Sequence, residues 1–96
     1  MYLGYQRIAI TDLVQLGSAA FTLPVGVNMA ELQSETSAVR YTMDNATNPS
    51  TSQGMLLRLT DEPKLFLIEN LLRMRFCRDG GANAVLNVHY SGGRSV

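Results

Sequence analysis

Residues 39–57 read VRYTMDNATNPSTSQGMLL, and this stretch decides the fold. Its first six residues, 39–44, alternate apolar and polar side chains, which is the two-residue period of a half-buried strand. Residues 45–53 are small or polar and contain no catalytic group, so they form a long exposed turn that closes at Gly54. Alternation resumes over residues 55–60. A strand, a loop and a second strand indicate an all-β fold.

Short alternating runs between turns continue through the rest of the chain. The turns that interrupt the apolar pattern lie at residues 24–27, 35–37, 61–63 and 79–81. In the last run, residues 85–90, we expect Leu86, Val88 and Tyr90 to face inward. Seven or eight short strands at this spacing predict a single small antiparallel β-sandwich of the jelly-roll or immunoglobulin-like type.

The length of 96 residues suits one domain and leaves no room for a second. Residues 1–18 include a weakly alternating run at 5–10, and we expect them to form an N-terminal arm or an edge strand. Residues 19–90 are expected to form the β-sandwich domain. Residues 91–96, which are rich in Gly and Ser, are expected to form a flexible C-terminal tail.

Residues 64–78 allow two interpretations. Their Leu, Met and Arg side chains favour a helix, because these are good helix formers. The strict alternation from residue 72 onward favours strands over residues 65–69 and 72–77. We favour the two strands, with a single turn of helix near Asn70 left open.

Eight basic and eight acidic residues give a formal net charge of zero. A protein that binds nucleic acid by neutralising phosphates needs a basic surface, so we expect no direct nucleic-acid partner. No apolar run is long enough to span a membrane, and the N-terminal residues lack the pattern of a signal peptide. A neutral surface also offers little repulsion between copies of the chain, which suits assembly.

Catalytic and metal-binding patterns do not emerge from this sequence. One Cys and one His, without carboxylates at ligand spacing, do not make a metal site. We expect Cys77 to be a buried, inert thiol and His89 to be an outward imidazole on a strand. The Gly pairs at 80–81 and 92–93 do not open helices, so a phosphate loop is not expected. We therefore predict no enzyme activity and no cofactor.

The arginines allow two readings. On a strand, Arg73 and Arg75 project from the same face as a basic stripe. This stripe is either a solvated face paired with carboxylates such as Glu31 or Glu35, or a contact with another protein, because Arg is enriched at interfaces. Arg40 is open to the same two readings.

A set of short stretches shares its pattern with one group of proteins. These stretches are LPVGV (23–27), MAELQ (29–33) with Glu35, VRYTMD (39–44), PS (49–50), GMLL (54–57) and AVLNVHY (84–90). Together they resemble small β-sandwich structural proteins of tailed bacteriophages, over about two thirds of the chain. The chain departs from that pattern at Asp44-Asn45, where the group has Asp-Gly, and has one residue more before Pro49. Asn tolerates a left-handed backbone, so we expect the turn to survive.

The resemblance implies a role on a virus particle. The function we expect is that of a capsid cement or decoration protein, a homo-oligomer that binds the major capsid protein or another virion protein. It would be made in the host cytoplasm and located on the virion, most simply on the capsid surface. The alternative is a head–tail or fibre accessory protein with a receptor- or carbohydrate-binding role. The lack of Trp, and of any aromatic residue within 45–53, counts against a sugar platform on the loop.

Contact residues are expected on the loop, on the arginine stripe and on the N-terminal segment, where exposed aromatic side chains favour interfaces. The candidates are Tyr2, Leu3, Tyr5, Arg40, Asp44, Asn45, Thr47, Asn48, Arg73 and Arg75.

Overall fold

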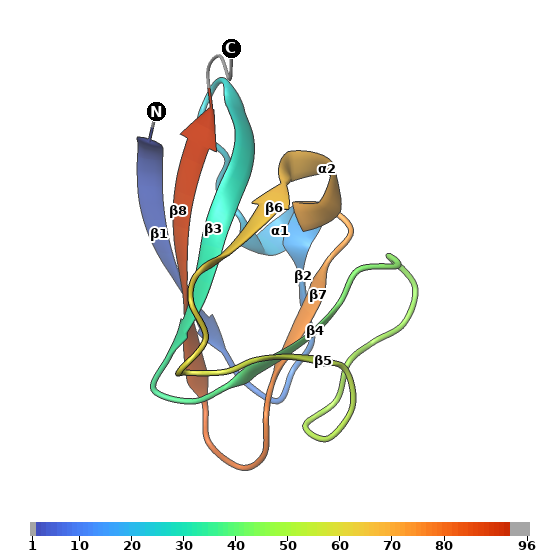
Figure 1. Cartoon of the computed structure of the whole chain (residues 1–96). Coiled ribbons are helices and arrows are strands. Elements are labelled where there is room, and N and C mark those ends of the chain that lie inside the picture. The colour runs from blue at the N-terminus through green and yellow to red at the C-terminus, as the bar shows by residue number, and fades with distance from the viewer. Residues whose placement is uncertain (1, 93–96) are drawn as a thin grey trace.

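The computed structural model describes residues 2–92 as eight strands and two helices of one turn each (Figure 1). In chain order, the elements are β1 (Tyr2–Ile10), β2 (Gln15–Leu16), α1 (Gly17–Ala20), β3 (Val27–Glu35), β4 (Val39–Thr42), β5 (Met55–Leu57), β6 (Lys64–Leu67), α2 (Ile68–Leu71), β7 (Arg75–Arg78) and β8 (Ala84–Gly92). In the described part of the chain, no helix is long and apolar enough to cross a membrane.

The strands form two antiparallel sheets of four strands each, in the orders β1-β8-β3-β6 and β2-β7-β4-β5. The pairs β1–β8, β2–β7, β3–β6 and β4–β5 are nested inside one another. The chain is therefore one long hairpin, rolled so that alternate pairs fall in opposite sheets. This result confirms the predicted all-β sandwich, and its strand order is that of the jelly roll rather than the immunoglobulin-like type.

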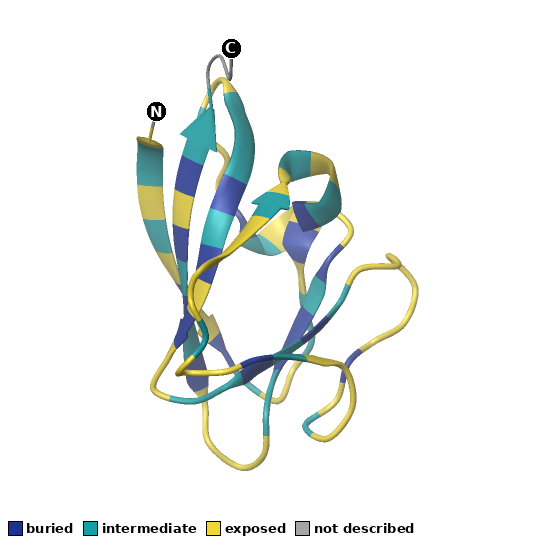
Figure 2. Cartoon of the chain, viewed as in Figure 1, coloured by how far each residue is buried: buried dark blue, intermediate teal, exposed yellow. Residues whose placement is uncertain are grey.

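Buried residues alternate with more exposed ones along the strands (Figure 2). The buried side chains of both sheets form one hydrophobic core. Leu86, Val88 and Tyr90 of β8 are at most 1% exposed, as their alternation predicted. Phe76 and Leu57 face them from the second sheet and are buried to the same extent. Burying one such side chain contributes about 1.5–3 kcal/mol, so these inward positions supply most of the fold's stabilisation.

The segment at 64–78 differs from the two strands that we favoured. Strand β6 ends at Leu67, α2 follows as a single helical turn, and β7 begins only at Arg75. The strand expected from residue 72 was therefore wrong at its start, whereas the helical turn left open near Asn70 is present. The turn is needed because β6 and β7 lie in opposite sheets, and it seats Leu71 fully in the core as the chain crosses.

Two further boundaries differ from expectation. Strand β5 ends at Leu57, because the N–H of Arg58 donates to the Asp61 carboxylate at 2.8 Å and turns the chain. At the other end, Ser91 and Gly92 belong to β8 and not to a tail. The remainder of the expected tail, residues 93–96, lies outside the described residues.

One end of the sandwich is closed by α1 and the segment after it. The ring of Phe21 packs edge-on against Phe76 at 5.6 Å and against Tyr90 at 6.4 Å. The side chain of Gln6 ties this segment to β1, since its amide donates to Ala20 O and accepts from the N–H of Thr22. The face of the β1-β8-β3-β6 sheet that points away from the second sheet is open to solvent.

Candidate functional site

The loop between β4 and β5 is organised by Asp44. Its Oδ1 accepts the backbone N–H groups of Ala46 at 3.0 Å and Thr47 at 2.8 Å, and its Oδ2 accepts the Thr47 hydroxyl at 2.6 Å. These hydrogen bonds, chiefly that of the Thr47 side chain, hold the pKa of Asp44 down to about 2. Asp44 is thus a turn-forming acceptor that stays ionised at neutral pH.

Asn45 adopts the left-handed backbone that its position requires, with φ of +57°. The turn at Asp44-Asn45 therefore forms as expected, because Asn tolerates this region. The N–H of Asn45 donates to the carbonyl oxygen of Arg73 at 3.2 Å, which anchors the turn to the segment before β7.

Arg75 fixes the same turn from the opposite side. Its guanidinium donates to the carbonyl oxygens of Asn45 at 3.0 Å and Ala46 at 3.2 Å, and to Oδ1 of Asn48 at 2.6 Å. Arg73 is exposed and precedes β7, so the expected stripe of Arg73 and Arg75 on one strand face was wrong. The alternation that suggested it runs through the end of a helical turn.

The side chain of Arg40 also forms its hydrogen bonds within the molecule. Its Nε donates to Oδ1 of Asp79 at 2.8 Å and its Nη1 to the carbonyl oxygen of Gly54 at 3.1 Å. The carboxylates that we considered as arginine partners lie elsewhere. Glu35 pairs with Arg7 at 3.2 Å, and Glu31 accepts the hydroxyl of Tyr2.

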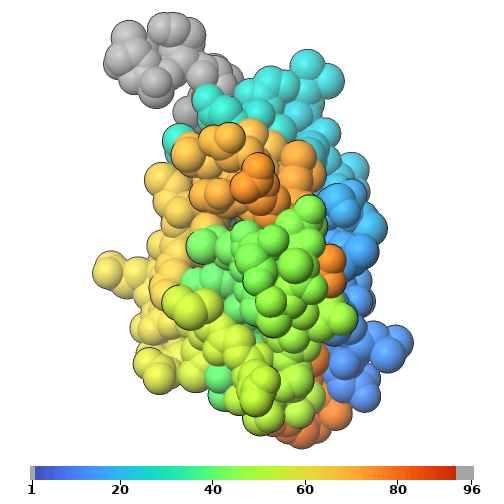
Figure 3. All heavy atoms as spheres, turned by 90° about the vertical axis from the view of Figure 1, so that its right-hand side faces the viewer, coloured from blue at the N-terminus to red at the C-terminus, as the bar shows by residue number. Residues whose placement is uncertain are grey.

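The structure thus brings Asp44, Asn45, Thr47, Asn48 and Arg75 together as one hydrogen-bonded unit. Figure 3 shows this loop, in green, lying below the orange atoms around α2 on one side of the molecule. Its polar groups bind one another, which holds the turn in one shape, and the exposed side chains of Met43 and Met55 flank it.

A second surface lies on the outer face of the sheet β1-β8-β3-β6. A bulge in β1 between Tyr2 and Gly4 places Tyr2 and Tyr5 on this one face, although a regular strand would send residues three apart to opposite faces. Leu3 packs against the core instead, so it does not act with them. The N-terminal segment is therefore the edge strand of a sheet, with its aromatic side chains outward.

His89 lies between the two tyrosines. The Tyr2 ring stacks on the imidazole with centroids 3.9 Å apart, and the Tyr5 ring meets it edge to face at 6.1 Å. The Tyr2 hydroxyl donates to Glu31, and this bond to the carboxylate raises the pKa of Tyr2. Tyr5 donates its hydroxyl to Oδ1 of Asn87.

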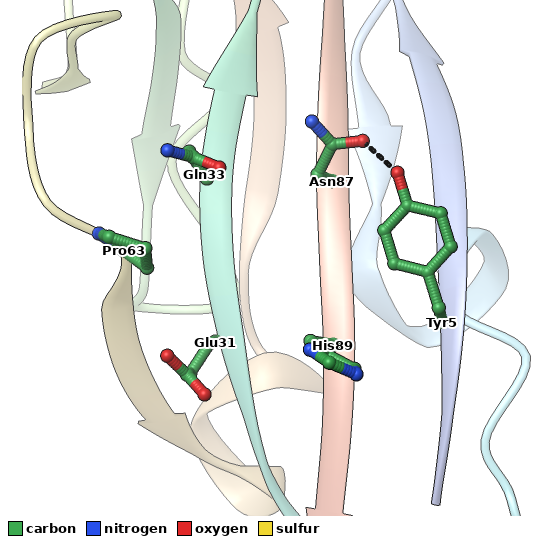
Figure 4. Close-up of a pocket in the computed structure, with 6 residues that line it drawn as sticks. All are labelled: Tyr5, Glu31, Gln33, Pro63, Asn87 and His89. Atoms are coloured by element: carbon green, nitrogen blue, oxygen red, sulfur yellow. Dashed lines mark hydrogen bonds between the residues drawn. The ribbon is translucent and has the colours of Figure 1, made fainter. Parts of the chain in front are cut away.

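These residues border a shallow pocket of about 120 Å³ (Figure 4). The residues that line it are Tyr5, Glu31, Gln33, Pro63, Asn87 and His89. Only Tyr5 was among the sequence candidates. Alternation did place Asn87 and His89 outward. A local sequence pattern does not predict which strands become neighbours, nor that a bulge turns Tyr2 to the same side.

Cys77 is buried, as expected, and its thiol lies 3.5 Å from the carbonyl oxygen of Asp12. Burial raises the pKa of this thiol, which keeps it protonated. Over residues 2–92, no cluster of three or more His, Cys, Asp or Glu side chains could hold a metal ion.

Comparison of the chain with protein-family models, with curated proteins and with solved structures found no match in any of the three. The function proposed below therefore rests on the residues and their geometry.

Proposed function

We propose that the protein is a structural component of a phage virion, most specifically a cement or decoration protein that binds the major capsid protein. The sequence pattern over residues 23–90 supports this assignment. The jelly-roll order is compatible with it, because this fold occurs in viral capsid domains, although it also occurs in lectins and cupins. A surface feature of the molecule supports the assignment more directly.

That feature is the free edge of β6. Leu65 and Leu67 point outward from this four-residue strand and are 58% and 48% exposed. Proteins that stay monomeric guard such edges with charges or proline, since unpaired strand edges recruit other chains. Here Pro63 and Lys64 guard only the start of the strand. An apolar, unpaired edge on a neutral chain is suited to being covered by another protein.

The size of a stable contact sets how much surface must take part. A standard interface buries about 800 Å² on each partner, which is about 15% of the 5442 Å² surface of this chain. Four residues of β6 do not supply that area. The contact therefore extends to the exposed Leu59 and Leu72, which flank β6 along the chain, and each copy uses the rigid loop at 44–53 for a second neighbour.

In this role the protein acts mechanically. One copy bridges two capsid subunits and adds buried area across their junction, which opposes outward pressure from the packaged genome. Where the β6 edge meets a second copy of the chain instead of the capsid protein, the two copies form a homo-oligomer.

Electron microscopy of the particle from which the chain comes tests the proposal. Copies arrayed on the capsid at local symmetry axes support it, and copies only at the tail overturn the cement role. In solution, Leu65→Thr with Leu67→Thr should abolish self-association and capsid binding, while Leu13→Thr, at a side chain 72% exposed elsewhere, should change neither. A monomeric protein that binds no capsid lattice would refute the proposal.

A further inference from the structure

We propose that the pocket on the outer face of the β1-β8-β3-β6 sheet binds a single ring of a neutral sugar. This site goes beyond the capsid role. Its lining residues lie on β1, β3 and β8 and at Pro63 just before β6, and none of them is Leu65, Leu67 or a residue of the loop at 44–53.

The stacking surface is the ring of Tyr5. Figure 4 shows this ring face-on, lying over the gap between β1 and β8, with the imidazole of His89 edge-on beside it. The Tyr5 side chain is 58% exposed, so one ring face is available to a ligand. A pyranose ring has an apolar face of C–H groups that packs on an aromatic ring, while its hydroxyl groups point outward from its rim.

Hydrogen-bonding groups lie beyond the edge of this ring, on β3, which β8 separates from β1 (Figure 4). Gln33 and Glu31 project from β3, and Pro63 forms an apolar wall beyond them (Figure 4). The amide of Gln33 makes no hydrogen bond within residues 2–92, and Oε2 of Glu31 and the ring nitrogens of His89 are likewise unbonded there. An amide, a carboxylate and an imidazole together offer both donors and acceptors, which is what vicinal hydroxyl groups require.

The site is held in shape before a ligand arrives. Tyr5 is fixed through Asn87, whose Nδ2 in turn donates to Oε1 of Glu35 at 2.9 Å. Tyr2 fixes the other side, because its ring stacks on His89 and its hydroxyl bonds Glu31. Preorganisation of this kind lowers the ordering cost of binding.

Charge and size select the class of ligand. The carboxylate of Glu31 faces the pocket, and no Lys or Arg lines it, so phosphates and acidic sugars are disfavoured. A volume of about 120 Å³ is below the roughly 300–1,000 Å³ of pockets that enclose drug-sized ligands. One exposed sugar ring at the end of a glycan fits this shallow site, and a buried cofactor does not.

An NMR titration of the ¹⁵N-labelled protein tests the site, with glucose, galactose, mannose and N-acetylglucosamine as the probes. We expect saturable shifts for at least one of them, centred on the backbone amides of Gln33, Asn87 and His89. Glu31→Gln removes a charge-assisted acceptor and should weaken binding about tenfold. Tyr5→Ala removes the stacking ring and should reduce affinity by more than that.

Matched variants separate binding from damage to the fold. Tyr5→Phe keeps the ring but loses the bond to Asn87, so it should bind more weakly than the native chain and more tightly than Tyr5→Ala. Glu69→Gln removes an exposed carboxylate on α2, away from the pocket, and should have no effect. If Tyr5→Ala unfolds, Glu31→Gln against Glu69→Gln carries the test. The proposal is overturned by the lack of saturable shifts with all four sugars, by shifts centred elsewhere, or by full affinity in Glu31→Gln.

Discussion

Nε of Arg40 donates to Oδ1 of Asp79 at 2.8 Å, and this ion pair ties strand β4 to the turn that follows β7. The two side chains are only 20% and 32% exposed, and Arg40 also bonds the carbonyl oxygen of Gly54. Arg40→Ala should therefore lower the free energy of unfolding by about 2 kcal/mol, measured by urea denaturation. Asp79→Asn retains an acceptor and should lose roughly half as much. Equal losses of unfolding free energy in both variants would show that the retained acceptor contributes nothing without the charge of Asp79.

Gly17 lies where no side chain fits. A Cβ there would come within 2.0 Å of the carbonyl oxygen of Leu71 and 3.0 Å of that of Met74. Gly17→Ala should therefore cost more than about 2 kcal/mol, because backbone atoms of α2 must move. Gly81→Ala is the control, since nothing lies within 4 Å of its Cβ position, and it should be close to neutral. Thermal unfolding of the two variants compares them directly, and similar melting temperatures would contradict the close approach.

Thr36 occupies the turn between β3 and β4 with φ of +79°, a left-handed conformation that a β-branched residue adopts at a cost. Because its side chain is exposed, the cost is not offset by packing. Thr36→Gly should raise the free energy of unfolding by about 1 kcal/mol. The neighbouring Ser37→Gly should lower it or leave it unchanged. Loss of stability in Thr36→Gly would show that the hydroxyl or methyl group contributes more than the strain costs.

The buried hydroxyl of Tyr90 should make the protein less stable in alkaline solution. Its hydroxyl donates to Oε1 of Gln6, and burial raises its pKa from 10.0 to about 12. Between these values the unfolded chain loses the proton and the folded chain keeps it, so stability is complete below pH 10 and falls by about 1 kcal/mol for each pH unit above it.

Tyr90→Phe isolates this effect. At neutral pH the variant should be less stable by about 1 kcal/mol, through loss of the hydrogen bond to Gln6. Its deficit should shrink as the pH rises above 10, because Phe does not titrate. Urea denaturation at several pH values measures both chains, and a deficit that stays constant from neutral pH to pH 12 would contradict the raised pKa.

The alternation of apolar and polar residues correctly predicted the all-β class and the inward face of β8. Leu86, Val88 and Tyr90 recur every second residue, and this period follows burial in a strand. The same rule failed at Leu72, where alternation continues through a helical turn that crosses between sheets. It failed again at Tyr2, because a bulge shifts which face the residue occupies. Where the chain crosses between sheets or a bulge shifts the register, contacts with residues distant in the chain decide which side chains face inward.

The candidate site was less accessible to sequence reasoning than the fold. The loop residues Asp44, Asn45, Thr47 and Asn48 were predicted to contact a partner. In the structure they form hydrogen bonds within the molecule, two of them to Arg75. The pocket depends on β8 lying between β1 and β3, which only the sheet order reveals. In the sequence alone, His89 has no neighbouring residue that would mark it as part of a site.

The nested strand order also has a consequence for how the protein is made. Tyr5 and Asn87 are joined by a hydrogen bond although they lie 82 residues apart, and β8 is inserted between β1 and β3. A ribosome completes β8 last among the strands, so the first sheet has a gap at its centre throughout most of translation. Folding then waits on the most distant pairing in the chain, which places this protein among slow, high-contact-order folders that take milliseconds to seconds. Until that strand is made, β1 has no partner strand and β3 lacks one of its two neighbours.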